Sequence, residues 1–258
     1  MDPLTWTGAL APLNYAFLAA AALLLAAVLV NIVVSVVAPD NGPVTVNPDG
    51  TLAAQTGPAA QVKTVMRWSL YATILIILAY VLLGVALGTG AGILGGMSQQ
   101  LWPVWLGLVV IFAASIRYKR KLGLYGKLFD STVGMIGFGL VMFWVLVGFM
   151  AGPFDLLITH NELSQVSGMK NKLPGTPLRR PDEGEFVWYL LGGDNLARDV
   201  FSRLLKGAWV VVQIAPLATL FAFMVGITLG LPAGYYGGRL DTILSFLANL
   251  ILAFPVIL

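Results

Sequence analysis

The 258-residue chain is strongly apolar: 58% of its residues are hydrophobic, 10% are charged, and its formal net charge is +3. Soluble domains carry about 25% charged residues, so this composition excludes an ordinary soluble fold. The absence of cysteine excludes disulfides and thiolate metal sites. The small positive charge is better explained by loops that face a membrane than by a nucleic-acid-binding surface.

Long apolar segments without charge predict membrane-spanning helices, each of which needs about 20 apolar residues. A Pro- and Gly-rich loop is expected over 39–61, and the Gly-rich stretch GTGAGILGGMSQQ separates the second span from the third. The sequence therefore predicts an all-α, polytopic transmembrane protein with about six spans. These spans are expected in residues 12–37, 68–90, 101–116, 131–152, 208–233 and 241–258.

Basic residues predict the orientation of these spans. Five of them lie in the short loop 117–127, and short cytoplasmic loops collect Lys and Arg. We therefore expect loop 117–127 on the cytoplasmic side. Counting spans outward from it places the N-terminus and the polar segment 153–206 on the outer side.

The charged stretch LGGDNLARDVFSRLLKGA, residues 191–208, precedes the fifth predicted span. Its spacing predicts an amphipathic helix over 195–206, with Asp194 as its N-cap. Leu196, Val200 and Leu204 share the apolar face, and Asp199 can pair with Arg203 four residues later. Such a helix suits the membrane interface, and the pattern alone leaves open whether it only anchors the chain or also contributes to function.

The same stretch and the residues after it resemble the permease subunits of dipeptide, oligopeptide and nickel ABC importers. The outer stretch shares with that family Gly192, Asp194, Arg198, Asp199, Ser202 and Arg203. The expected cytoplasmic turn shares Gly234, Tyr235, Tyr236, Gly237, Gly238 and Asp241, and the last predicted span ends on the shared pair Phe254–Pro255. The chain departs from the family pattern at Gly193, Ala197 and Asn249.

This resemblance implies a multi-pass protein of the inner membrane that forms half of an alternating-access path. The implied partners are a second permease subunit, two cytoplasmic ATPase subunits, an extracytoplasmic solute-binding protein and the lipid bilayer. Residues 131–258 would be the N-terminal part of the permease domain, and 1–130 an additional region of three spans. The family's later ATPase-docking loop has no counterpart here, and the chain stops inside an apolar helix, so we expect an incomplete core and a truncated product or fragment.

The resemblance leaves other functions open. A non-transporting scaffold or assembly subunit is the main alternative. A secondary transporter is less favoured because no charged residue lies in the interior of a predicted span. An enzyme is not expected, since no ATP-binding signature occurs and no cofactor, catalytic or metal site is indicated. His160 is expected to be a solvated side chain, and the Gly226–Gly230 pair is expected to pack helices closely.

Overall fold

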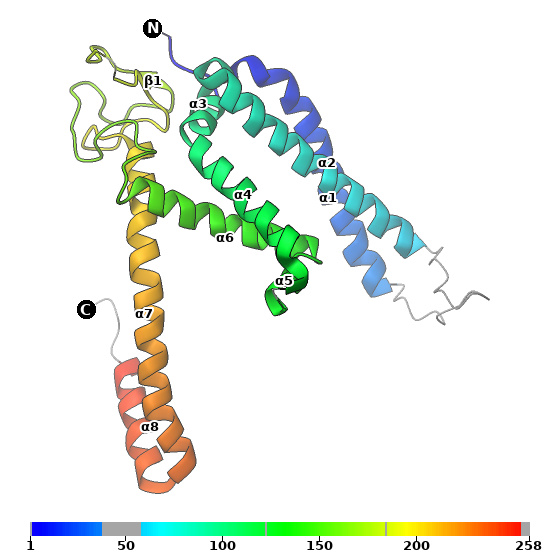
Figure 1. The fold of residues 1–258 in the computed structure, drawn as a ribbon, viewed down its shortest axis with the longest axis vertical. Helices are drawn as coiled ribbons and strands as arrows, with labels where there is room; N and C mark the ends of the chain where they lie inside the picture. Colours follow the sequence, from blue (N-terminus) through cyan, green and yellow to red (C-terminus); the bar gives the residue numbers. More distant parts are fainter. Residues whose placement is uncertain (1, 38–57, 122, 184, 254–258) are drawn as a thin grey trace.

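The computed structural model describes residues 2–37, 58–121, 123–183 and 185–253, and most of them are helical (Figure 1). The α-helices within these residues are α1 (Ala11–Val37), α2 (Pro58–Leu87), α3 (Gly92–Gln100), α4 (Trp102–Tyr118), α5 (Leu124–Leu128), α6 (Thr132–Ala151), α7 (Val200–Tyr236) and α8 (Gly238–Ala253). Three 3-10 helices are η1 (Gly8–Leu10), η2 (Gly88–Ala91) and η3 (Lys119–Lys121), and β1 (Thr176–Pro177) pairs antiparallel with β2 (Trp188–Tyr189). The predicted all-α membrane fold is confirmed.

Four segments of the described chain are long and apolar enough to cross a membrane: Gly8–Val37, Ala60–Gln100, Thr132–Ala151 and Val200–Tyr236. Helices α4 and α8 have 17 and 16 residues, fewer than the roughly 20 that one span needs. The predicted count of six spans is therefore not confirmed.

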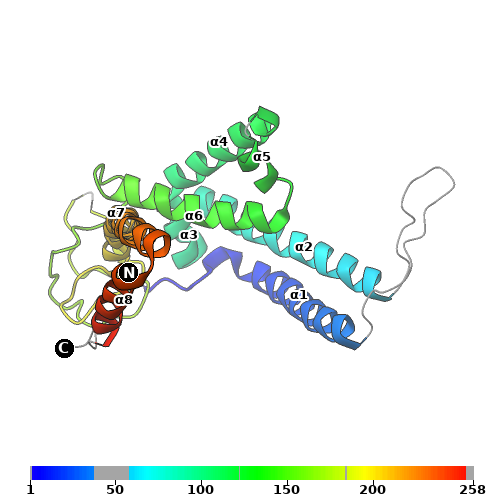
Figure 2. The ribbon, with the colours of Figure 1, turned by 90° about the horizontal axis from the view of Figure 1, so that it is seen from below.

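Helices α1 and α2 form an antiparallel hairpin, and they lie side by side in both views (Figures 1 and 2). Inside it the Tyr80 hydroxyl donates to the side-chain oxygen of Asn14 at 2.5 Å, and the Asn14 amide donates to Thr7 at 3.0 Å. Each polar group thus has a partner, as an apolar environment requires. The predicted loop 39–61 lies outside the described residues except for its last four, which begin α2.

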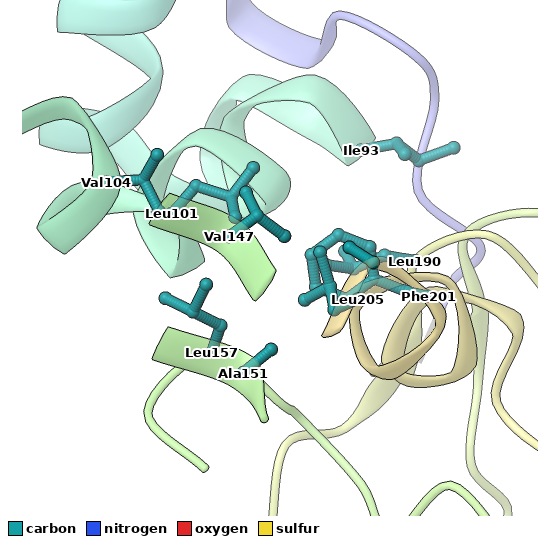
Figure 3. Close-up of a cluster of buried hydrophobic side chains, with 10 residues drawn as sticks. Ile93, Leu101, Val104, Val147, Ala151, Leu157, Leu190, Phe201 and Leu205 are labelled. Atoms are coloured by element: carbon teal, nitrogen blue, oxygen red, sulfur yellow. The ribbon is translucent and has the colours of Figure 1, made fainter. Parts of the chain in front are cut away.

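The main hydrophobic core lies where α3, α4, α6 and the start of α7 meet the polar segment (Figure 3). Its buried members are Ile93, Leu101, Val104, Val147, Ala151, Leu157, Leu190, Phe201, Leu205 and Ala208. Glycines let α6 and α7 approach closely, because a Cβ at Gly152 would overlap the Trp209 ring and one at Gly148 would lie 2.9 Å from Val212. The core therefore fixes the first turns of α7 against the rest of the protein.

The N-terminal segment is tied to the polar segment and to α3 by backbone hydrogen bonds. The Leu4 amide donates to the Gly175 carbonyl at 2.9 Å, and the Ile93 amide donates to the Thr5 carbonyl at 2.9 Å. Gly175 has a φ of +78°, and a Cβ there would lie 2.6 Å from the Leu4 carbonyl oxygen, so glycine is required. The N-terminal segment, α3 and the polar segment lie at one end of the molecule (Figure 1). The side of the membrane on which the N-terminus and segment 153–206 lie stays a prediction.

The α7–α8 hairpin projects away from the other helices (Figures 1 and 2). In the described part of the chain, almost every α7 side chain from Val210 to Leu231 is exposed. An apolar surface of this length is compatible with lipid, or with protein that covers it in the membrane.

Candidate functional site

The first turn of α7 is built on Asp199. Its carboxylate accepts from the backbone amides of Phe201 and Ser202, each at 3.2 Å, which makes it the N-cap. The helix begins at Val200, so the predicted helix over 195–206 with Asp194 as its cap is wrong in its start and in its cap. The reason is local: Ala197 has a φ of +62°, a left-handed conformation that cannot belong to an α-helix.

Asp194 instead organises a tight loop before the helix. Its carboxylate accepts from the amides of Leu196 at 2.8 Å and Arg198 at 2.9 Å, and from the Arg198 guanidinium at 2.8 Å. Arg203 lies 3.5 Å from the same carboxylate, so the predicted Asp199–Arg203 pair is replaced by one between Asp194 and Arg203. Desolvation alone would raise the pKa of Asp194, but the hydrogen bonds from Arg198 and Leu196 outweigh it and lower the pKa to about 2.

Asp199 is the centre of a buried polar cluster and is itself 0% exposed. One carboxylate oxygen accepts from the Ser202 hydroxyl at 2.6 Å and from the Thr159 hydroxyl at 2.9 Å, and it lies 3.2 Å from His160 Nδ1. Burial would raise the pKa of Asp199, but the hydrogen bonds from His160 and Ser202 prevail and lower it. The cluster ties α7 to residues 40 positions earlier in the chain.

His160 is buried in this cluster, with its side chain only 3% exposed, so the expectation of a solvated histidine is wrong. Its Nε2 lies 2.7 Å from the carbonyl oxygen of Phe186. No local sequence pattern indicates this partnership, because the described residues between α6 and α7 are almost entirely irregular and distant positions meet only after folding. The only sequence feature that sets His160 apart is that it is the sole histidine of the chain.

The residue types of a nucleophilic triad are present, but their arrangement is different. In such a triad the histidine faces the serine hydroxyl and the carboxylate orients the histidine. Here the Ser202 hydroxyl donates directly to Asp199, and His160 Nε2 faces the carbonyl of Phe186. The serine hydroxyl therefore has no histidine nitrogen facing it, and the arrangement fastens backbone segments together.

The start of α7 has one buried and one exposed side. Phe201 and Leu205 are buried in the core, whereas Leu196 and Leu204 are 45% and 47% exposed. Leu196 and Leu204 are thus exposed, whereas Val200 is half-buried. Because α7 begins at Val200, Leu196 lies before the helix, and the three residues do not form the predicted apolar face of one helix.

The second motif forms the sharp turn at the other end of α7. Gly237 and Gly238 have φ values of +59° and +58°, so both need glycine's freedom. Tyr235 and Tyr236 are 84% and 75% exposed. Asp241 lies in the first turn of α8 and accepts from the Ser245 hydroxyl at 3.3 Å, a favourable place for an acid.

The two motifs are separated by the length of α7. A helix of 37 residues is about 55 Å long at 1.5 Å per residue, so the structure does not bring the outer motif and the turn together. Between them Gly226 lines a shallow, open apolar groove with Ala222, Phe223 and Ile227. No atom lies within 4 Å of a Cβ built at Gly226, Gly230 or Gly234 among the described residues, so close helix packing at Gly226 and Gly230 stays a prediction.

Comparison with known proteins finds local similarity only. No protein-family model matches the sequence, and no solved structure matches it. The glutathione transport system permease protein GsiD of Pectobacterium atrosepticum is 42% identical over 79 residues, which cover 31% of this chain and 26% of that protein.

Longer matches are found to two dipeptide transport system permease proteins named DppC. That of Alkalihalophilus pseudofirmus is 29% identical over 134 residues, 52% of this chain and 40% of the relative. The DppC protein of Bacillus subtilis is 30% identical over 132 residues, which cover 51% of this chain and 37% of that protein. The matched part is less than half of each relative, and about half of this chain is similar to permease proteins of peptide transport systems.

Proposed function

We propose that the chain is a transmembrane permease subunit of an ABC importer and forms part of its translocation path. The observation that carries this proposal is α7, a 37-residue apolar helix with an ordered loop at one end and a two-glycine turn at the other. The residues that the chain shares with the permease family lie at both ends of α7. Similarity to proteins named as peptide and glutathione transport permeases supports short peptides as the class of solute.

The exposed hairpin supports the proposed partners. The start of α7 packs against α6, but its side chains from Val210 to Leu231 are mostly exposed. A second permease subunit would cover part of this exposed surface and of α8. The loop around Asp194 and the polar segment would face an extracytoplasmic solute-binding protein. Two ATPase subunits on the cytoplasmic side would supply the energy, because the chain has no ATP-binding signature of its own.

An uptake experiment tests the proposal. The chain is expressed with the second permease subunit, the ATPases and the binding protein of a peptide importer, in cells that lack their own peptide permeases. We expect uptake of a labelled dipeptide that depends on this chain and is abolished by an inactive ATPase, which serves as the matched control. Uptake that is identical with and without the chain would overturn the proposal.

A second measurement separates the permease from the scaffold alternative. The chain is purified with an affinity tag, and the other subunits are identified in the eluate. Association with the other subunits without any chain-dependent uptake would favour a non-transporting assembly subunit.

A further inference from the structure

The basic segment 117–130, from the end of α4 to the start of α6, has a strong excess of positive charge. Its five cations are Arg117, Lys119, Arg120, Lys121 and Lys127. Asp130 is the only carboxylate between residues 50 and 154 of the sequence, so the segment has a net charge of +4. Asp130 pairs with Lys119 at 2.9 Å. The other four cations are exposed and have no acidic partner among the described residues.

Four aromatic rings hold the basic segment against the neighbouring helices. Phe112 of α4 and Phe138 of α6 meet two rings of the segment edge-on, with ring centroids 5.3 to 5.9 Å apart. These two rings are Tyr125 and Phe129. The Tyr125 hydroxyl also lies 2.8 Å from the Ser115 hydroxyl of α4. The cations are therefore carried by a turn that is fixed to two helices.

The backbone of the basic segment is folded tightly. Gly126 packs against η3 so closely that a Cβ there would overlap the carbonyl oxygen of Lys119. The Phe129 amide donates to the Gly126 carbonyl at 3.1 Å, and the Asp130 amide donates to the Lys127 carbonyl at 3.1 Å. Helix α5 lies where the end of α4 and the start of α6 converge (Figure 1). The cations therefore gather at one end of these two helices.

The start of α6 places the basic segment at a membrane surface. Helix α6 is long and apolar enough to cross a membrane, so the residues directly before it lie at the height of the lipid headgroups. Tyr118 is 53% exposed and Leu124 is 83% exposed. Tyrosine rings concentrate at this height of a bilayer, and an exposed leucine beside them can enter the boundary of the acyl chains.

We propose that the basic segment is a binding site for the headgroups of anionic phospholipids. An arginine guanidinium binds a phosphate through two parallel hydrogen bonds, and a lysine binds it as a point charge. Leu124 would contact the acyl chains of the same lipid. An acidic protein in the aqueous phase would match the charge, but not the exposed leucine and tyrosines at the membrane surface. The proposed lipid site does not depend on the permease function.

The first test measures which lipid lies beside the segment in a bilayer. The chain has no cysteine, so Val133→Cys places one fluorophore at an exposed position in the first turn of α6. The labelled chain is reconstituted into phosphatidylcholine vesicles that contain a small fraction of nitroxide-labelled phosphatidylglycerol or, separately, of nitroxide-labelled phosphatidylcholine. We expect stronger quenching by phosphatidylglycerol, and a smaller difference in 1 M salt, which screens the attraction.

A second label position controls for quenching elsewhere on the chain. Leu156→Cys places the fluorophore at an exposed position beyond the other end of α6, about 30 Å from the basic segment along a helix of 20 residues. The two lipids should quench this label equally. Equal quenching by the two lipids at Val133→Cys as well would overturn the proposal.

Charge variants assign the preference to the segment. Each Lys or Arg near an anionic surface contributes roughly fivefold to binding, so Arg120→Gln with Lys121→Gln should lower the preference for phosphatidylglycerol roughly 25-fold. Arg120→Lys with Lys121→Arg keeps both charges and should keep most of the preference. The matched control, Lys170→Gln with Lys172→Gln, removes two exposed cations from the polar segment and should change little. An equal loss in this control would show that only the net charge of the chain attracts the lipid, which would refute a site.

Two further measurements identify a different ligand. Inorganic phosphate, added at constant ionic strength, should leave the quenching unchanged; loss of the lipid preference would show a site for free phosphate and refute a lipid site. The chain is also purified together with ATPase subunits. If Arg120→Gln with Lys121→Gln loses these subunits but keeps its lipid preference, the segment binds a protein and the proposal is refuted. Uptake is measured in none of these experiments, so they decide the lipid site whether or not the chain is a permease.

Discussion

The replacement of Asp199 by alanine tests whether the buried cluster stabilises the protein as a unit. The carboxylate of Asp199 caps α7 through two backbone amides and also accepts from Ser202, Thr159 and His160. Asp199→Ala removes all of these acceptors at once. It leaves the buried Ser202 hydroxyl and the His160 ring without their common partner.

The expected loss of unfolding free energy distinguishes a role as a helix cap alone from a role at the centre of a buried cluster. Loss of an N-cap alone costs about 1 kcal/mol. Leaving the buried Ser202 hydroxyl and the His160 ring without this partner costs about 1–3 kcal/mol for each group, roughly 2–6 kcal/mol together. We expect the loss of unfolding free energy for Asp199→Ala to lie in the range for the unsatisfied buried groups. Asp199→Asn keeps one oxygen for the cap and should cost about 1–3 kcal/mol, the penalty for one unsatisfied buried donor.

The free energy of unfolding can be measured by titrating the purified chain from a mild detergent into a denaturing one and following tryptophan fluorescence. Asp241→Ala serves as the control, because its exposed carboxylate lies in the first turn of α8, where the interaction with the helix dipole is worth less than about 1 kcal/mol. A loss of about 1 kcal/mol or less for Asp199→Ala would show that this residue acts only as a helix cap, and the reasoning about the buried cluster would be refuted.

A reporter fused near residue 170 should face the outside and one near residue 120 the cytoplasm; a cytoplasmic reporter at 170 would reverse the orientation. Acidification should loosen the loop around Asp194, because a carboxyl whose pKa is lowered to about 2 contributes stability above its ordinary pKa of 3.8 and loses it as the pH falls toward 2. Limited proteolysis between pH 5 and pH 2 measures this, and Asp194→Asn should reduce the pH dependence; Asp199, whose pKa is also lowered, accounts for a further part. Gly92→Ala should release the N-terminal segment to proteolysis, because Gly92 has a φ of +72° and a Cβ there would overlap the Thr5 carbonyl; Gly90→Ala, with no atom within 4 Å, should not.

Hydropathy predicted the long helices well, because a long charge-free segment has few structures other than a helix available to it in a membrane. Helix α1 was expected over 12–37 and is found at Ala11–Val37, and α6 was expected over 131–152 and is found at Thr132–Ala151. The starts of α2 and α7 were predicted less well. Helix α2 begins ten residues before its predicted span and α7 eight residues before, which is about three and about two turns.

The sequence indicated which residue types could cap the helix at the candidate site, but not which residue does so or what it contacts. Asp194 and Asp199 are both residue types that cap helices, and the left-handed conformation of Ala197, which decides between them, has no sequence signal in a residue with a methyl side chain. The partner of Asp199 is His160, 39 residues away in an irregular segment. Neither periodicity nor spacing reports such a contact, because it depends on the path of the whole segment.

The bond between the Leu4 amide and the Gly175 carbonyl has a consequence for how the chain is made. The two residues are 171 positions apart, so Leu4 emerges from the ribosome long before its acceptor exists. The bond can form only after α6 and the residues up to 175 have been synthesised. This end of the molecule is therefore completed when the segment that precedes α7 meets residues that were made much earlier.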